Sequence, residues 1–205
     1  MRHGPGHGHL RCLRALSRAT AIYDACVLYP APLRDFLLQL ACAGLFRARW
    51  TNAIHEEWTR NLLAERPDLS AAALDRTRHL MDRAVPDALV RGYEPLLPRL
   101  VLPDPDDRHV LAAAIQGGAD VIVTFNLKDF PPAKLKPHGI RALHPDKFIG
   151  EWISRAPEAI CLSAKLCRQR LKKPPMTAGD YISCLARQGL NSTASFLAEN
   201  TAAIM

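Results

Sequence analysis

Short apolar runs alternate with stretches of helical periodicity through the middle of the chain. Apolar and β-branched runs of four to six residues are typical of buried strands, and apolar positions three or four residues apart are typical of helices. Strands are predicted at 20–23, 46–51, 120–124 and 140–143, and helices at 32–43, 52–64, 70–84 and 107–118. Because parallel strands are joined by helical crossovers, this alternation predicts an α/β fold with a parallel sheet covered on both faces. Residues 85–106 contain five prolines and are expected to be mostly loop.

The two ends of the chain differ from this middle part. Residues 1–18 are rich in glycine, histidine and arginine, so we expect a disordered basic leader there. From about 145 the pattern is helical, with Pro174-Pro175 as a break and Thr177-Ala178-Gly179-Asp180 as a capping box before the next helix. The predicted organisation is a leader at 1–18, a central domain at 19–150 and a basic helical extension at 151–205.

The net charge of +7 is carried by the ends of the chain. Residues 1–18 hold four arginines and no acid, and residues 151–205 hold seven basic and four acidic residues, which leaves 16 of each for 19–150. The central domain can therefore keep a local acidic pocket while the ends attract a polyanion.

Cysteine and membrane signals are weak. The six cysteines contain no C-x-x-C pair, so we expect small, buried, reduced side chains rather than a zinc site or disulfides. The apolar stretch at 10–29 is interrupted by charged residues and does not resemble a signal peptide or a membrane helix. A cytoplasmic protein without membrane contact is predicted.

Acidic residues stand where predicted elements end or begin: Asp24, Glu57, Asp107 and Asp129. The carboxyl ends of parallel strands meet at one edge of a sheet, where ligands gather. Several oxygen ligands at one point suit Mg²⁺ or Mn²⁺, so the pattern predicts a carboxylate-lined metal pocket. Alternatives stay open: Asp107 is also a helix cap, Asp129 can brace its turn, and Glu56 competes with Glu57.

Four segments together resemble, in order and spacing, the PIN-domain ribonucleases, and in particular the branch that contains VapC-type toxins. They are Asp24-Ala25-Cys26-Val27-Leu28-Tyr29-Pro30, Glu57-Trp58 with Leu62-Leu63, Asp104-Pro105-Asp106-Asp107-Arg108-His109-Val110-Leu111, and Thr124-Phe125-Asn126-Leu127-Lys128-Asp129-Phe130-Pro131. The resemblance covers about 19–150. It implies a three-layer αβα fold and Mg²⁺- or Mn²⁺-dependent endonucleolytic cleavage of single-stranded or looped RNA. It also implies the toxin role in a toxin–antitoxin pair, with a cognate antitoxin as partner; a homodimer stays open.

The resemblance also implies roles for individual residues. Asp24, Glu57 and Asp107 match the three acids that hold the metal, and Asp129 matches the acid after the last motif. The remaining candidates are supporting groups, Thr124 and Asn126, and cations that could face RNA, Arg108, Lys128, Lys172 and Lys173. Two departures from the family pattern stand out. Cys26 occupies a position that is often Asn or Ser, which is expected to remove a polar group, and Asn126 stands where many members have Asp, which lowers the negative charge.

A second function remains open: a non-catalytic PIN-fold module that binds RNA or protein without cutting. Asn126 favours it, and the intact acids oppose it. Another carboxylate enzyme is a weaker alternative, because a haloacid-dehalogenase-type phosphatase needs a second Asp at position 26, where this chain has Cys26.

Overall fold

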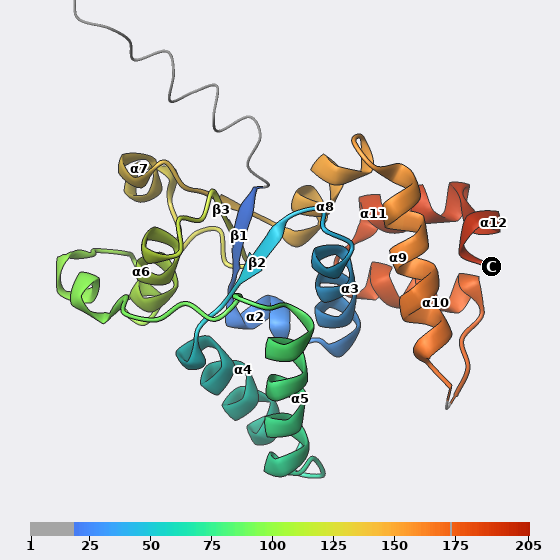
Figure 1. Cartoon of the computed structure of the whole chain (residues 1–205), viewed down its shortest axis with the longest axis horizontal. Coiled ribbons are helices and arrows are strands. Elements are labelled where there is room, and N and C mark those ends of the chain that lie inside the picture. The colour runs from blue at the N-terminus through green and yellow to red at the C-terminus, as the bar shows by residue number, and fades with distance from the viewer. Residues whose placement is uncertain (1–18, 173) are drawn as a thin grey trace, which may run out of the picture.

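A four-stranded parallel sheet forms the centre of the computed structural model, which describes residues 19–172 and 174–205 (Figure 1). The strands are β1 (Thr20–Tyr23), β2 (Arg47–Arg49), β3 (Val121–Val123) and β4 (Arg141–Leu143), in the order β2-β1-β3-β4. All three pairings are parallel, and Ile22 at the centre of β1 is aligned with Arg49 of β2 and Ile122 of β3.

Helices cover both faces of this sheet. The helices that precede β3 in the chain are α2 (Ala25–Leu28), α3 (Ala31–Cys42), α4 (Asn52–Glu65), α5 (Ala71–Ala84), the 3₁₀ helix η1 (Glu94–Arg99) and α6 (Arg108–Gln116). The helices that follow β3 are α7 (Pro132–Leu135), the 3₁₀ helix η2 (Lys136–His138), α8 (Pro145–Ile153), α9 (Pro157–Arg170), α10 (Ala178–Arg187), α11 (Asn191–Glu199) and α12 (Thr201–Ile204). In Figure 1 the sheet runs between α6 and α7 on one side and α3 and α8 on the other. The predicted αβα fold is confirmed.

Burial explains why the central strands could be recognised as continuous apolar runs. Every residue of β1 and β3 is buried, because helices cover both faces of these two strands. Strand β2 lies at the edge of the sheet and alternates between exposed Arg47 and buried Ala48. The carboxyl ends of β1 and β3 therefore lie side by side and are fixed by the most deeply buried part of the core.

Most predicted elements agree with the structure within a few residues, with two corrections. The strand predicted at 46–51 is reduced to β2, because Trp50 leaves this pairing and forms a parallel bridge with Leu89. The region expected to be loop contains η1, in which Pro95 occupies the first turn and Pro98 lies inside the helix. A 3₁₀ helix accommodates these prolines because it is short and leaves few backbone donors to satisfy.

The C-terminal helices α8 to α12 pack beside the sheet domain (Figure 1). Helix α9 packs on α3, and α11 packs on α8. The predicted capping box is present, since Thr177 Oγ1 accepts from the Asp180 amide at 3.1 Å and Asp180 Oδ2 accepts from the Thr177 amide at 3.2 Å. The predicted domain boundary between 150 and 151 falls inside α8.

Some sequence predictions fall outside this description or need correction. The leader at 1–18 and Lys173 lie outside the described residues. Cys42 is exposed and Cys26 is only half-buried, so the expectation that the cysteines are simply buried apolar residues is wrong at these two positions. None of the helices in the described ranges is both long enough and apolar enough to cross a membrane.

Candidate functional site

Asp24 lies directly at the carboxyl end of β1. Its amide donates to the Val123 carbonyl at 3.1 Å, which continues the pairing of β1 with β3 by one residue. Its side chain caps α2, with Oδ1 accepting from the Ala25 amide at 2.6 Å. Asp24 is only 2% exposed, so its carboxylate is fixed in a buried position at the edge where the two central strands end.

Two side chains hold the second oxygen of this carboxylate. Thr124, which follows β3, donates from Oγ1 to Asp24 Oδ2 at 2.7 Å, and the Cys26 thiol donates to the same oxygen at 3.1 Å. Thr124 Oγ1 also accepts from the Asn126 amide at 2.9 Å, and Cys26 Sγ accepts from the Phe125 amide at 3.3 Å. The expectation that Cys26 removes a polar group is therefore wrong, because the thiol both donates and accepts here.

Burial controls the protonation of these groups. Burial raises the pKa of Asp24 above its ordinary value, hydrogen bonds from Thr124 and Cys26 partly offset this, and the charge of Glu57 raises it further. Burial, and then the neighbouring Asp24 carboxylate, raise the pKa of the Cys26 thiol far above its ordinary range. Cys26 therefore stays protonated and available as a donor at neutral pH.

Asp107 stands at the first residue before α6, but its side chain makes no capping hydrogen bond. Its backbone carbonyl instead accepts from the Val110 amide at 3.0 Å. Burial raises the pKa of Asp107 to about 7, with further contributions from the charges of four acids, Asp24, Asp104, Asp129 and Glu57. The helix-cap interpretation thus does not describe this side chain, and the shift shows that acids from four segments share one electrostatic environment.

Glu57 reaches this environment from α4, which begins at the cap residue Thr51. Its Oε2 lies 3.2 Å from His109 Nε2 on the first turn of α6, while the Nδ1 atom of His109 is buried without a partner among the described residues. The rival Glu56 is exposed. The contact between His109 and Glu57 was not predicted from the sequence, because it joins two residues 52 positions apart.

The turn after β3 carries the remaining candidates. The Asp129 amide donates to the Asn126 carbonyl at 3.0 Å, so this turn is closed by its own backbone while the Asp129 side chain stays half-buried. Asn126 and Lys128 are exposed. Asp104 braces its own turn, with Oδ1 accepting from the Asp106 amide at 2.9 Å, and it also adds charge near Asp107.

The acids influence one another's charge, but among the described residues they do not form a complete set of metal ligands. Across 19–172 and 174–205, no three side chains of His, Cys, Asp or Glu are grouped closely enough to hold a metal ion. The site thus combines an excess of negative charge with oxygen donors, which suits a hard cation. One buried carboxylate, Asp24, is already held by hydrogen bonds, and the charges of Asp24 and Glu57 both act on Asp107.

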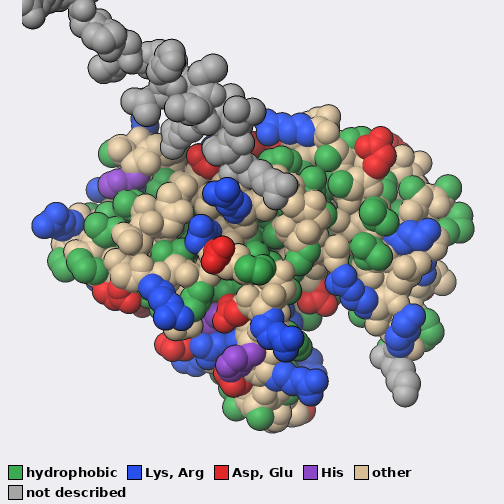
Figure 2. All heavy atoms as spheres, in the orientation of Figure 1, with side chains coloured by type: hydrophobic (Ala, Val, Ile, Leu, Met, Phe, Trp, Pro, Cys, Tyr) green, Lys and Arg blue, Asp and Glu red, His purple; other side chains and the backbone are tan. Residues whose placement is uncertain are grey.

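The cationic candidates among the described residues come from different segments of the chain. Arg108 Nε donates to the Pro105 carbonyl at 2.7 Å, and Arg108 lines a hollow of about 370 Å³ that also includes Leu97 and His109. Lys172 is exposed and forms an isolated bridge with Pro175, far along the chain from the acids. On the face of the molecule that Figure 2 views, Lys and Arg side chains are scattered among acidic and apolar ones.

Two arginines of α9 make intramolecular bonds. Arg168 donates to the Ile204, Met176 and Met205 carbonyls at 3.1, 3.1 and 2.6 Å, and Arg170 donates to Gln39. Arg168 thus links parts of the extension to one another, and Arg170 links the extension to α3.

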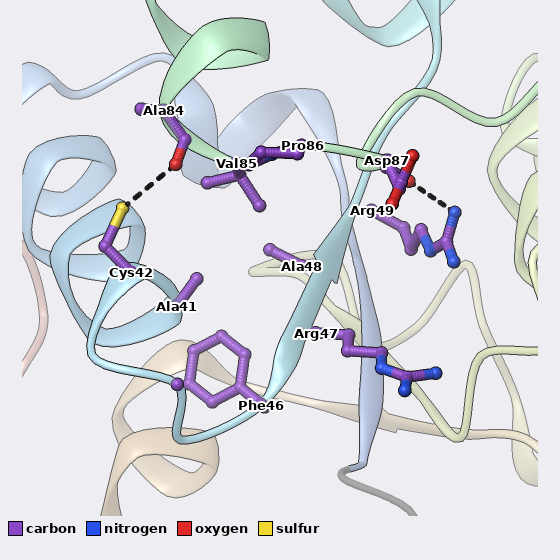
Figure 3. Close-up of a pocket in the computed structure, with 11 residues that line it drawn as sticks. Ala41, Cys42, Phe46, Arg47, Ala48, Arg49, Ala84, Val85, Pro86 and Asp87 are labelled. Atoms are coloured by element: carbon purple, nitrogen blue, oxygen red, sulfur yellow. Dashed lines mark hydrogen bonds between the residues drawn. The ribbon is translucent and has the colours of Figure 1, made fainter.

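A separate hollow of about 450 Å³ lies at the exposed side of β2 (Figure 3). Phe46, Arg47 and Ala48 line it from the strand side, and the segment from Ala84 to Asp87 closes it, with Cys42 Sγ donating to the Ala84 carbonyl at 3.4 Å. None of the acids around Asp24 lines this hollow. The candidate site is thus at the carboxyl ends of the strands rather than in this hollow.

Comparison with known proteins agrees with this architecture. The family model for the PIN domain matches residues 20–128, and the model for the VapC50 C-terminal domain matches residues 145–199. The chain therefore belongs to the PIN-domain family, in its VapC-type branch.

One curated relative shows where this similarity extends. The chain is 43% identical over 82 residues to a protein of Mycobacterium tuberculosis (strain ATCC 25618 / H37Rv) named "Putative ribonuclease VapC50". The match covers 40% of this chain and 48% of that relative, so the chain matches about half the length of the relative. No solved structure matches the chain.

Proposed function

We propose that this protein is a Mg²⁺- or Mn²⁺-dependent endoribonuclease that cleaves single-stranded or looped RNA. The observation that carries the proposal is the half-buried position of Asp107 among other acids: burial, and then the charges of Asp24, Asp104, Asp129 and Glu57, raise its pKa to about 7. Strongly perturbed carboxyl groups in one cluster are typical of functional sites. The similarity to a relative whose name includes ribonuclease supports the same reaction class.

The residues fit a divalent cation by their chemistry. Asp24, Glu57 and Asp107 would hold it, Asp129 would add a further carboxylate, and Asn126 would add a neutral oxygen. A bound ion of this kind supplies activation of a water molecule and stabilisation of the leaving oxygen in phosphodiester hydrolysis. The unused side chain of Asp107 supports this assignment, because it is not engaged in capping α6.

The protein's own groups prepare this chemistry by orienting the carboxylates. Thr124 and Cys26 fix Asp24 Oδ2, and the Ala25 amide fixes Oδ1, so Asp24 needs no reorganisation when it acts. His109 Nε2 lies 3.2 Å from Glu57 Oε2 and so restrains this second carboxylate. Oriented groups of this kind reduce the reorganisation that the reaction requires.

The wider biological role follows from the family branch. We propose that residues 19–150 form the nuclease domain and 151–205 an extension, in the toxin of a toxin–antitoxin pair that acts in the cytoplasm. Its partners would be RNA and a cognate antitoxin protein, with a homodimer as one form. Arg108, Lys128, Lys172 and Lys173 are the candidates for contact with RNA phosphates.

Cleavage of defined RNAs by the purified protein in Mg²⁺, Mn²⁺ or EDTA tests this function. Glu57→Gln is expected to lower the rate about 100-fold or more, comparable to the loss of a main electrostatic stabiliser. The matched control is Glu56→Gln, which changes the exposed neighbour in the same helix and should leave the rate unchanged. Equal rates for the two variants, or full activity in EDTA, would contradict the proposal.

A second candidate function is a PIN-fold module that binds RNA or protein without cutting. It is favoured by the absence, within the part of the chain that the structure describes, of three potential ligands grouped for one metal ion. Asn126 in place of a further acid points the same way. Binding of RNA with an unchanged affinity in EDTA, and no cleavage in Mn²⁺, would identify this module.

A further inference from the structure

The turn between α10 and α11 brings the C-terminal extension against the candidate site. Gly189 in this turn has φ +80°, a backbone conformation that favours glycine. A Cβ atom built on Gly189 would lie 3.6 Å from Phe125 Cε1 and 3.7 Å from His144 Cε1. These are ordinary van der Waals distances, so a single added Cβ would bring this turn into contact with both Phe125 and His144.

Phe125 connects this turn to Asp24. It stands between Thr124 and Asn126, and its amide donates to Cys26 Sγ at 3.3 Å. Its ring meets His144 edge-on, with ring centroids 5.1 Å apart. A displacement of Phe125 would therefore be passed to Cys26 and Thr124, which are the two side chains that hold Asp24 Oδ2.

The turn is anchored well enough to act as a support. Leu190 is fully buried, and the Gly189 amide donates to the Ala186 carbonyl at 2.9 Å. Asp146 at the start of α8 accepts from the Ser192 and Thr193 amides at 2.8 and 2.9 Å, which fixes the first turn of α11. The Asp146 amide in turn donates to His144 Nδ1 at 3.2 Å, so the turn and His144 belong to one packed unit.

From these contacts we propose that the α10–α11 turn is a positioning element for the site: it sets the place of Phe125 and, through Cys26 and Thr124, the orientation of Asp24. This inference rests on the proposed function for its catalytic consequence. It gives the extension a defined task, in which Gly189 leaves the space beside Phe125 and His144 open: a Cβ would just touch both rings, and a longer side chain would have to displace them or turn away.

Two matched substitutions test this positioning role. Gly189→Asn introduces bulk against Phe125, whereas Gly139→Asn introduces the same side chain at φ +70° with no atom within 4 Å of its Cβ. Asn tolerates positive φ better than most residues, so the backbone cost is similar and small in both variants. Only the first variant should disturb the site.

Two measurements are compared between these variants: the binding of Mn²⁺ by calorimetry without RNA, and the kcat and KM for cleavage of one defined RNA. Gly189→Asn is expected to lower kcat at least 10-fold and to weaken Mn²⁺ binding several-fold, with KM for RNA changed less than about threefold. Gly139→Asn should match the wild type in all three. A lower kcat and a weaker Mn²⁺ affinity with KM for RNA preserved would indicate that the acids are misplaced. A general loss of structure would change KM for RNA as well.

A third variant keeps the test decisive if Gly189→Asn does not fold. Phe125→Leu removes the ring contact with His144 without adding bulk, and it should lower kcat and Mn²⁺ affinity in the same direction. Folded Gly189→Asn or Phe125→Leu proteins that equal Gly139→Asn would overturn the positioning role while leaving the proposed function intact. A wild type that neither cuts RNA nor binds Mn²⁺ would instead overturn the proposed function.

Discussion

Neutralising Asp107 should stabilise the metal-free protein at high pH. Burial and the charges of Asp24, Asp104, Asp129 and Glu57 raise the pKa of Asp107 to about 7 in the folded state, from an ordinary value of 3.8. Between these two values the folded state retains a proton that the unfolded chain has released. The free energy of unfolding therefore falls as the pH rises through this window, and the loss is complete above about pH 7.

The size of this effect follows from the shift. About three pKa units at 1.36 kcal/mol each give an upper limit of roughly 4 kcal/mol. Asp107 is half-buried, so solvent screening should reduce the effect to about 1–2 kcal/mol. Asp107→Asn removes the charge, and we expect it to raise the metal-free unfolding free energy by that amount at pH 8 and by almost nothing at pH 4.

Urea unfolding at pH 4, 6 and 8, in EDTA and at fixed ionic strength, measures this difference. Asp106→Asn is the control, because it changes the adjacent exposed carboxylate by the same chemistry. A gain for Asp107→Asn at pH 8 that is no larger than that of Asp106→Asn would refute the crowding of charge at Asp107. A gain that persists unchanged at pH 4 would refute its electrostatic origin.

Three further predictions follow from the contacts of the site and the extension. Mn²⁺ should bind the wild type more tightly as the pH rises through about 7, because Asp107 must lose its proton to act as a ligand. The Mn²⁺ affinity of Asp107→Asn should be weak and nearly independent of pH over that range. Calorimetric titrations at pH 6 and 8 compare the two proteins. Cys26→Ser should keep kcat within about threefold, because a hydroxyl can also donate to Asp24 and accept from Phe125. Cys26→Ala should lower kcat about 10-fold. Equal kcat values for the two variants would show that these hydrogen bonds do not orient Asp24. Arg168→Ala should lower the free energy of unfolding by about 1–3 kcal/mol, because it removes the donors to the Ile204, Met176 and Met205 carbonyls. The salt dependence of RNA binding should not change; a smaller salt slope would assign Arg168 to RNA instead.

The parts of the structure that the sequence predicted are those set by local pattern and burial. The strands β1 and β3 are covered on both faces, so their apolar runs were visible without any knowledge of the neighbours. Asp24 and Thr124 stand immediately after these strands, and parallel pairing places them together. Helix starts at Thr51, Ser70 and Thr177 were also predictable, since each side chain accepts from a backbone amide three residues later.

The parts that the sequence did not predict depend on contacts between distant segments. The Cys26 thiol meets Phe125 across 99 positions of sequence, so its polar role could not be inferred from its chemical type alone. His109 of α6 meets Glu57 of α4 across 52 positions of sequence. Arg168 belongs to the extension that was predicted to be basic, but its guanidinium donates to the Ile204, Met176 and Met205 carbonyls. In each case the orientation of one side chain, rather than the pattern, decides its role.

The most direct test of a shared acidic site is the Mn²⁺-induced rise in melting temperature of the wild type and of Asp24→Asn. Metal bound to the folded state alone adds about 2.7 kcal/mol of stability at a concentration of 100 times its Kd. If Asp24 belongs to one site with Glu57 and Asp107, Mn²⁺ at fixed ionic strength should raise the melting temperature of the wild type by several degrees, and Asp24→Asn should lose most of this rise. Equal responses of the two proteins to Mn²⁺ would contradict a shared site.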